Sequence, residues 1–274
     1  MTENSKTEST PAIVAHNVWK SYGATSVLKG LDLNLPQGKT LVILGRSGVG
    51  KSVLLRQIVG IEKPDQGYIE VAGNRITDLK KADLYKLMSN FGMLFQSSAL
   101  FDSMNVGENV AFYLKQHGDP KTKDNLPEDE IQERVHVALQ KVGLEGYEVK
   151  MPSDLSGGQK RRAALARLII YQPKIMLYDE PTTGLDPITS MQINELIINT
   201  QADLQATSIV VTHDINSALD IGDLFALHHE GKLQFIDEKE HFIQSGNPLI
   251  HEFLSNAVIP QKYTQFIMSQ NIHT

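Results

Sequence analysis

The first stretch that could do chemistry is the glycine-rich segment GRSGVGKS, at residues 45–52. It follows TLVILG, a short apolar run typical of a strand buried on both faces of a parallel sheet, and it precedes KSVLLRQIVGI, which has helical spacing. This is the context that the phosphate-binding pattern G-x-x-x-x-G-K-[ST] requires. Glycines let the backbone curl so that N–H groups point inward, and the helix that begins near Lys51 adds its positive dipole end. We therefore predict a cradle for nucleotide phosphates, in preference to a plain glycine turn before a helix.

Two side chains of this loop and two carboxylates have separate expected tasks. Lys51 should reach the β- and γ-phosphates of a nucleotide, and Ser52 should ligate Mg²⁺. The apolar run IMLYDE ends in Asp179, the expected partner of the metal ion, and Glu180. Ligands gather at the carboxyl ends of strands in open α/β sheets, so Glu180 could polarise a water for attack on the γ-phosphate. An acidic pair that only caps a strand is the alternative.

Two further groups stand at predicted strand ends. Gln96 ends FGMLFQ, where its amide could touch Mg²⁺ or the attacking water, and His213 ends SIVVTH, where its imidazole could bond the γ-phosphate. Taken alone, each is more often structural than catalytic. The other histidines, including His228 and His229 in the predicted hairpin FALHHEGKLQFID, are expected to be solvated.

A second anion site is indicated by LSGGQKRRAALAR, residues 155–167. Residues 156–158 offer a hydroxyl and unobstructed N–H groups at the start of a helix, where an anion is favoured. Two such sites on one chain suggest that each nucleotide lies between loop 45–52 of one copy and turn 156–159 of another. A plain serine N-cap followed by flexible glycines is the alternative.

Composition sets the outer limits. A chain of 274 residues that is 41% hydrophobic can bury the core of one large or two modest domains. Its formal net charge is -6, whereas nucleic-acid binders usually carry a basic excess, so no nucleic-acid partner is expected. It has no cysteine, which excludes disulfides, thiolate metal sites and cysteine nucleophiles. No apolar run approaches the ~18 residues of a membrane span, so work at a membrane would depend on a partner.

The pattern along the chain predicts an α/β fold. Residues 1–10 are polar and are expected to form a flexible tail, not a signal peptide. Strand and helix patterns alternate on both sides of a helical stretch at about 97–171. We therefore expect an α/β core, over residues 11–240, with an inserted helical subdomain.

Taken together, LSGGQ, the phosphate loop and IMLYDEPTTGLDP resemble the nucleotide-binding subunits of ABC transporters, over about residues 12–240. The resemblance implies a P-loop NTPase (RecA-like) core with an antiparallel β-subdomain, and ATP and Mg²⁺ as ligands. It implies that Glu180 is the catalytic base, His213 the switch histidine, and Gln96 a glutamine that contacts Mg²⁺ and faces the membrane partner. Asp186 falls in the loop that couples the two sites.

The resemblance also assigns nucleotide contacts. Tyr22 should stack on adenine with Val27 beside it, and Val53 offers an N–H but no second hydroxyl after Ser52. The expected ATP-binding residues are Tyr22, Val27, Gly45, Arg46, Ser47, Gly48, Val49, Gly50, Lys51, Ser52 and Val53. The residues expected to contact the nucleotide of a second copy are Ser156, Gly157, Gly158 and Gln159.

A narrower resemblance rests on QSSALFDSMNVGENVAF, MPSDLSGG and RRAALAR, which differs from the QRVAIAR usual in solute importers. These segments look like the Mla-type ATPases of Mce-family phospholipid transporters. That implies a second copy of the chain, integral MlaE-like permease subunits, periplasmic MlaD-like Mce-domain subunits and a small cytoplasmic MlaB-like STAS-domain subunit. It also implies a peripheral place on the cytoplasmic face of a bacterial inner membrane. Leu100, Phe101 and Met104 are expected either to form the permease-docking groove or to belong to the subdomain core.

Other interpretations remain open. An ABC importer ATPase for amino acids or another small solute would share the chemistry and differ in the docking groove. A non-transport ABC protein acting on DNA or ribosomes is disfavoured by the acidic charge, and a P-loop kinase would have no use for LSGGQ. Residues 241–274 read as a closing helix, NPLIHEFL, and a tail whose Tyr263, Phe266, Ile267 and Met268 could pack on the second copy or on their own domain.

Overall fold

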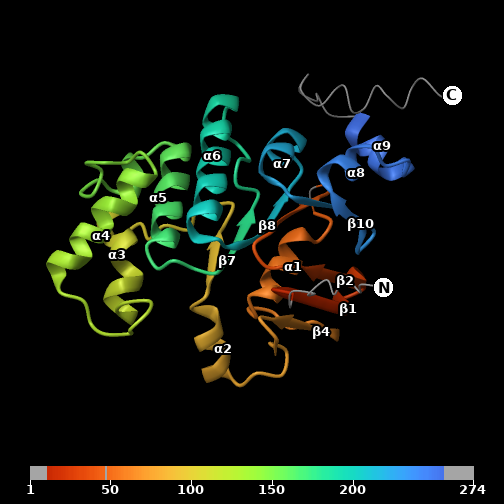
Figure 1. The fold of residues 1–274 in the computed structure, drawn as a ribbon, viewed down its shortest axis with the longest axis horizontal. Coiled ribbons are helices and arrows are strands. Elements are labelled where there is room, and N and C mark those ends of the chain that lie inside the picture. The colour runs from red at the N-terminus through yellow and green to blue at the C-terminus, as the bar shows by residue number, and fades with distance from the viewer. Residues whose placement is uncertain (1–10, 47, 256–274) are drawn as a thin grey trace, which may run out of the picture.

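Two sheets and ten helical segments build the part of the chain that the computed structural model describes, residues 11–46 and 48–255 (Figure 1). The larger sheet has the order β10-β9-β3-β8-β7-β6, in which only β10 runs antiparallel to its neighbour. Its strands are β3 (Thr40–Leu44), β6 (Phe91–Leu94), β7 (Ile175–Asp179), β8 (Thr207–Thr212), β9 (Leu224–His229) and β10 (Lys232–Glu238). Every residue of β3, β7 and β8 is buried, as the continuous apolar runs predict.

The smaller sheet is antiparallel and has the order β2-β1-β4-β5. Its strands are β1 (Ile13–Tyr22), β2 (Thr25–Leu35), β4 (Gln66–Val71) and β5 (Asn74–Arg75). Helix α1 (Lys51–Ile58) joins the two sheets, because Leu54, Leu55 and Ile58 pack in one core cluster with strands from both. The expected α/β fold with an antiparallel β-subdomain is confirmed.

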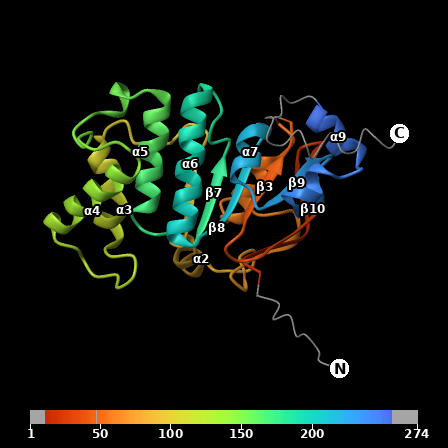
Figure 2. The ribbon, with the colours of Figure 1, turned by 45° about the horizontal axis from the view of Figure 1, so that its top comes forward.

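Helices cover the larger sheet and extend beyond it. They are α2 (Lys81–Met88), α3 (Val106–His117), α4 (Glu128–Lys141), η1 (Pro152–Asp154), α5 (Gly157–Ile169), α6 (Pro187–Leu204), α7 (Ile215–Ile221), α8 (Lys239–Ile243) and α9 (Pro248–Ser255). Helices α3, α4 and α5 gather at one end of the molecule, on the far side of α6 from the small sheet (Figures 1 and 2). They share a second core cluster with α6 and α7, so the helical group is packed onto the α/β core.

Local chemistry explains where the key helices begin. Asn105 and Glu108 form a reciprocal capping box at α3, with both backbone-to-side-chain bonds at 2.8 Å. Ser156 and Gln159 form another at α5. The turn between β9 and β10 falls at Glu230-Gly231, both with positive φ, as the hairpin pattern predicts.

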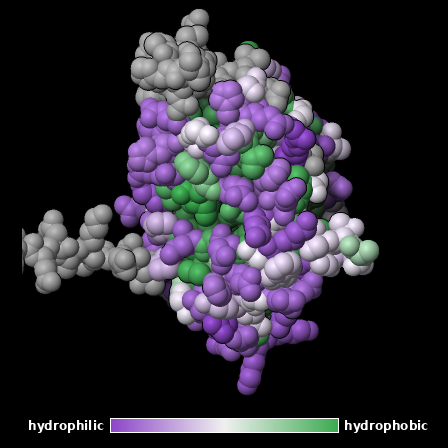
Figure 3. Space-filling model, turned by 90° about the vertical axis from the view of Figure 1, so that its right-hand side faces the viewer, coloured by the Kyte–Doolittle hydropathy of each residue, from purple (hydrophilic) through white to green (hydrophobic). Residues whose placement is uncertain are grey.

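The described helices include none that is both long enough and apolar enough to cross a bilayer. Seen from the side that carries β10 and α9, the surface shows apolar residues gathered in a strip through an otherwise polar face (Figure 3). Strand β10 exposes Phe235 and Ile236, by 39% and 37%. Three sequence-based expectations fall outside the described residues: the tail 1–10, Ser47, and the apolar patch of the tail beyond residue 255.

The expectation that His228 is solvated is wrong. Its residue is 2% exposed, because β9 is an internal strand and the phosphate loop lies directly against it. A Cβ added to Gly45 would lie 3.0 Å from the His228 carbonyl oxygen. Neither ring nitrogen has a hydrogen-bond partner among the described residues. Burial, followed by the positive charge of Lys51 and a smaller effect of His229, lowers the pKa of His228 to about 4.

This depressed pKa predicts acid sensitivity. The unfolded chain binds a proton at His228 near pH 6.5 and the folded chain only near pH 4, so folding stability falls as pH drops through that window. Between pH 7.5 and pH 5 the loss from this one group is about 2 kcal/mol. Replacing it by a leucine, His228→Leu, should remove that part of the pH dependence in urea unfolding curves. The exposed His251→Leu serves as control, and equal pH slopes for both variants would contradict the assignment.

Candidate active site

Strand register brings three of the predicted residues to one edge of the large sheet. In the parallel pairs, Leu44 of β3 lies opposite Thr212 of β8, and Asp179 of β7 lies opposite Val211 of β8. The next residues along the three strands are therefore neighbours: Gly45, His213 and Glu180. This is the carboxyl edge where ligands bind in open α/β sheets.

The phosphate loop runs from this edge into α1. Gly48 and Gly50 have φ of 79° and 109°, and a Cβ at Gly50 would lie 2.4 Å from Val27 Cγ1, so a side chain cannot be accommodated there. Val27 thus lies against the loop, beside the expected path of the nucleotide. A cavity of ≈ 690 Å³ opens here, and its walls include Ser26, Val27, Gly45, Arg46, Gly48, Val49 and His213. That volume suits a ligand of nucleotide size.

Lys51 is held inside the loop. Its Nζ donates to the carbonyl oxygens of Gly45 (2.7 Å) and Arg46 (3.0 Å) and lies 3.3 Å from Glu180 Oε1. The residue is only 5% exposed, so its charge is poorly screened by water. An incoming phosphate would meet this ammonium at the N-terminal end of α1, where the helix dipole also favours an anion. The side chain of Arg46 points elsewhere, to Glu252 of α9 at 3.0 Å.

Ser52 and Asp179 form the pair expected to hold a metal ion. Ser52 Oγ donates to Asp179 Oδ1 at 2.9 Å. Burial raises the pKa of Asp179 above its usual value, the Ser52 hydrogen bond opposes the rise, and the nearby Glu180 carboxylate adds to it. A divalent cation would offset this crowding of negative charge, and hydroxyl and carboxylate oxygens are donors that Mg²⁺ accepts. The residues present therefore fit a Mg²⁺ ion.

Glu180 is fixed on several sides. Its Oε2 accepts hydrogen bonds from Thr183 Oγ1 (2.9 Å) and Thr212 Oγ1 (3.3 Å), and it lies 2.9 Å from His213 Nδ1. Its backbone has φ of 49°, an uncommon conformation for a residue with a side chain, which often marks a functional position. The two threonines were not predicted from the sequence. The sequence signal that could have indicated them is their position: Thr183 is three residues after Glu180, and Thr212 immediately precedes His213.

Tyr22 ends β1 and is 45% exposed, as a ring that stacks on a base must be. Its hydroxyl donates to Glu62 Oε1 at 2.5 Å, and Glu62 in turn lies 3.4 Å from both Lys20 Nζ and Arg56 Nε. Arg56 belongs to α1, so this network ties the ring to the helix that follows the phosphate loop. Glu62 could not be predicted from the sequence, because it lies 40 positions from Tyr22.

Removing the hydrogen bond that positions the Tyr22 ring should weaken ATP binding and leave the rate of hydrolysis unchanged. The change Glu62→Ala removes one hydrogen bond to the Tyr22 hydroxyl, and so does Tyr22→Phe. Each should raise the KM for ATP by roughly 3- to 10-fold with kcat unchanged, which is what about 1 kcal/mol of lost positioning gives. Steady-state hydrolysis measures this, with Asp78→Ala in the same subdomain as control. A KM equal to that of the control would contradict the role of Glu62.

The turn at residues 156–159, here called the signature turn, lies apart from this site. Ser156 Oγ accepts from the Gln159 N–H at 3.3 Å, and Gln159 Oε1 accepts from the Ser156 N–H at 2.9 Å. A Cβ at Gly158 would lie 2.4 Å from Thr189, and one at Gly157 would lie 3.5 Å from Leu185, so the turn packs against the start of α6 in its own chain. In the view of Figure 1, α6 and β7 lie between α5 and α1.

Three further predicted residues have different surroundings. Asp186 caps α6, since its Oδ1 accepts from the Thr189 N–H at 3.0 Å, and its hydrogen bonds to Thr189 lower its pKa. Gln96 is exposed and lies two residues beyond β6, whose Leu94 is opposite Tyr178 of β7. It therefore stands beside the strand end that carries Asp179. Val53 is buried in the core cluster under α1.

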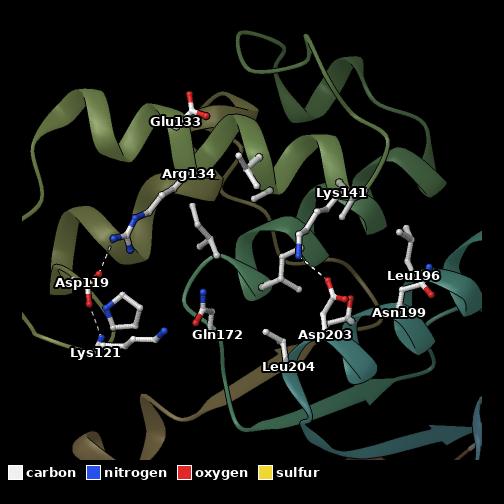
Figure 4. Close-up of a pocket in the computed structure, with 17 residues that line it drawn as sticks. Asp119, Lys121, Glu133, Arg134, Lys141, Gln172, Leu196, Asn199, Asp203 and Leu204 are labelled. Atoms are coloured by element: carbon white, nitrogen blue, oxygen red, sulfur yellow. Dashed lines mark hydrogen bonds and ion pairs between the residues drawn. The ribbon is translucent and has the colours of Figure 1, made fainter.

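A second hollow, of ≈ 640 Å³, lies between α4 and the end of α6, away from these strand ends (Figure 4). Two ion pairs lie in its lining: Lys141 Nζ is 2.7 Å from Asp203, and Arg134 is 2.8 Å from Asp119. Its floor is apolar and includes Ile169, Ile170 and Leu204. It contains none of the residues expected to contact ATP.

The ABC transporter family model matches residues 28–183, more than half of the chain. The chain belongs to the ABC transporter family. As an ABC-type ATPase, it binds ATP and hydrolyses it. The fold agrees: the dimeric post-hydrolysis structure of the ATP-binding cassette MJ0796, bound to ADP and Pi, superimposes with a TM-score of 0.75 at 31% identity, over 82% of this chain and 98% of that one.

Among curated relatives of this ABC ATPase, the intermembrane phospholipid transport ATP-binding protein MlaF of Haemophilus influenzae is 39% identical over 242 residues, or 88% of this chain and 89% of that protein. The probable ribonucleotide transport ATP-binding protein mkl of Mycobacterium leprae is 37% identical over 248 residues, or 90% of this chain and 70% of that protein. These names point to different cargoes, while both are ATP-binding proteins of transport systems. The chain is an MlaF-like ABC transporter ATPase.

Proposed function

We propose that this chain drives a transporter that moves phospholipids between the inner and outer membranes of a bacterium and so maintains outer-membrane lipid asymmetry. The observation that carries the proposal is the 39% identity to MlaF across 88% of this chain and 89% of that protein. The two chains thus correspond along nearly their whole lengths, including the segment after Gln96 that would face a membrane subunit.

The segment after Gln96 has the form of a rigid docking loop. Asn109 is fully buried; its Oδ1 accepts from the Phe101 N–H at 2.8 Å, and its Nδ2 donates to the carbonyls of Phe101 and Met104 at 3.1 and 2.9 Å. Phe101 is 41% exposed, with its ring 4.8 Å from that of Phe112. Leu100 instead packs against the core. A pinned loop that presents an aromatic ring suits a short helix of an MlaE-like permease.

The proposed assembly contains two copies of this chain. Each ATP would lie between the phosphate loop of one copy and Ser156–Gln159 of the other, since these two anion-binding elements are separated within one chain. The N–H groups of Gly157 and Gly158 would then neutralise charge on the γ-phosphate. The tail beyond residue 255 is proposed to pack on the second copy and favour pairing, with MlaD-like and MlaB-like subunits completing the complex on the inner membrane.

Within each site, the chain's own residues would share the work. Lys51 would transfer its donors from the loop carbonyls to the phosphates, and Glu180 would accept the proton of the attacking water. His213, Thr183 and Thr212 would keep the Glu180 carboxylate in place. Ser52 and Asp179, with Gln96, would hold Mg²⁺, which when bound neutralises phosphate charge. Hydrolysis would remove the bridge between the two copies, which would separate and move the permease.

The competing function is that of an importer ATPase for amino acids or another small solute. The 37% identity to mkl, a protein named for ribonucleotide transport, supports this alternative. The discriminating experiment isolates the intact membrane complex through this chain and identifies the bound molecule by mass spectrometry. We expect phospholipid, retained in excess over a complex that carries a known solute importer's ATPase. A bound nucleotide or amino acid and no enriched lipid would favour the importer.

A further inference from the structure

The motif RRAALAR contains a buried cation that the proposed reaction does not use. Arg161, in the second turn of α5, is 5% exposed, and its Nη1 donates to the carbonyl oxygen of Phe95 at 2.5 Å. Arginine is almost never fully buried without a partner, because removing its charge from water is costly. Phe95 immediately precedes Gln96. The guanidinium therefore holds the backbone from which the Gln96 side chain projects.

A second arginine of the same helix holds the next part of this segment. Arg167 Nη1 donates to the Ala99 carbonyl at 2.7 Å, and Nη2 donates to the Ser98 carbonyl at 3.3 Å. Ser98 and Ala99 have φ of 64° and 48°. Such conformations are uncommon for residues other than glycine and persist only where the surroundings hold them. Helix α5 thus fixes the loop on both sides of Gln96 and Ser97.

The electrostatic surroundings connect Arg161 to the metal site as well. Burial lowers the pKa of this guanidinium, and the negative charge of Asp179 opposes the effect. Arg161 therefore lies close enough to Asp179, the carboxylate that is proposed to hold Mg²⁺, for the two charges to interact. Helix α5 begins at Gly157, so one rigid element carries both the signature turn and the group that holds Phe95.

We propose that Arg161 is a positioning residue for ATP hydrolysis, which fixes the Phe95 backbone so that Gln96 points at the nucleotide and ties that backbone to the helix of the signature turn. The inference rests on the proposed role of Gln96.

The first test is kinetic and uses the full-length chain in the complex isolated from its membrane. The change Arg161→Gln should lower kcat roughly 10- to 100-fold, the effect of a small misplacement in an active site, and alter the KM for ATP less than about twofold. The change Arg161→Lys keeps the positive charge and an N–H donor group, so it should recover part of kcat. Lys160→Gln, one position away on the same helix, is the matched control. Thermal unfolding confirms that each variant folds.

The second test asks whether Arg161 acts through Gln96. In a Gln96→Ala background, adding Arg161→Gln should lower kcat by less than about twofold, because groups that act as a unit are not additive. If the two effects multiply, or if Arg161→Gln raises KM and leaves kcat unchanged, the inference is overturned while the role of Gln96 stands. If Gln96→Ala alone keeps full turnover, the proposed role of Gln96 fails and takes the inference with it. Should Arg161→Gln not fold, the same cycle is run with Arg161→Lys, for which we expect a loss of about threefold.

Discussion

Replacing Glu180 by glutamine is expected to lower the turnover number for ATP by roughly 10²–10⁴, the usual contribution of a general base. Glutamine keeps the shape and one acceptor oxygen for Thr183, so the fold and the loop around it should persist. What is lost is the ability to take a proton from water. ATP should then remain bound, and with it the pairing of two copies.

The Glu180→Gln prediction has two independent readouts. Steady-state phosphate release gives the turnover, and light scattering of the ATP-loaded protein gives the mass of the particle. We expect slow hydrolysis together with a stable pair of chains. Glu195→Gln, on α6, is the control and should hydrolyse as the unaltered protein does. Normal turnover in Glu180→Gln would exclude Glu180 as the base and require another group to activate water.

Replacing Lys51 by methionine should weaken ATP binding by roughly 10²–10⁴, because removing one partner of a buried charge pair, here the ammonium that would face the phosphates, costs about 3–5 kcal/mol. Lys51 is 5% exposed and contacts both the loop carbonyls and Glu180. Water would therefore not compensate for the loss of its positive charge. Methionine fills similar space, which keeps the loop packed.

Isothermal titration with ATP and Mg²⁺ measures the effect of Lys51→Met directly. The control is Lys39→Met, which removes an exposed lysine just before β3. A thermal unfolding curve for each variant separates lost binding from lost folding. An affinity for ATP within threefold of the control would contradict the placement of the phosphates over the loop.

Much of the fold could be predicted because its signals are local. A few neighbouring residues are enough to predict the buried strand Thr40–Leu44, the glycine loop and the turn at Glu230-Gly231. The start of α5, with Ser156 as its N-cap, is likewise encoded by its capping box. Strand order is less local, yet the parallel pattern was enough to predict that Asp179, Glu180 and His213 end at one edge.

What the sequence could not reveal are contacts between distant segments. The bond from Arg161 to Phe95 spans 66 positions, and that from Tyr22 to Glu62 spans 40. Such pairs depend on how helices and sheets pack, which no pattern of spacing states. His228 was misjudged for the same reason: its burial follows from the place of β9 next to β3 and from the glycine loop that lies on it.

In the proposed mechanism, ATP is enclosed by two chains, each of which supplies one anion-binding element. The most direct measurement is a cryo-EM or crystal map of the Glu180→Gln complex with ATP and Mg²⁺. We predict that the N–H groups of Gly157 and Gly158 and the Ser156 hydroxyl of one copy lie within hydrogen-bond distance of the γ-phosphate on the other copy's loop 45–52. A map in which ATP is bound and Ser156 of the second copy lies far from that phosphate would contradict the central claim.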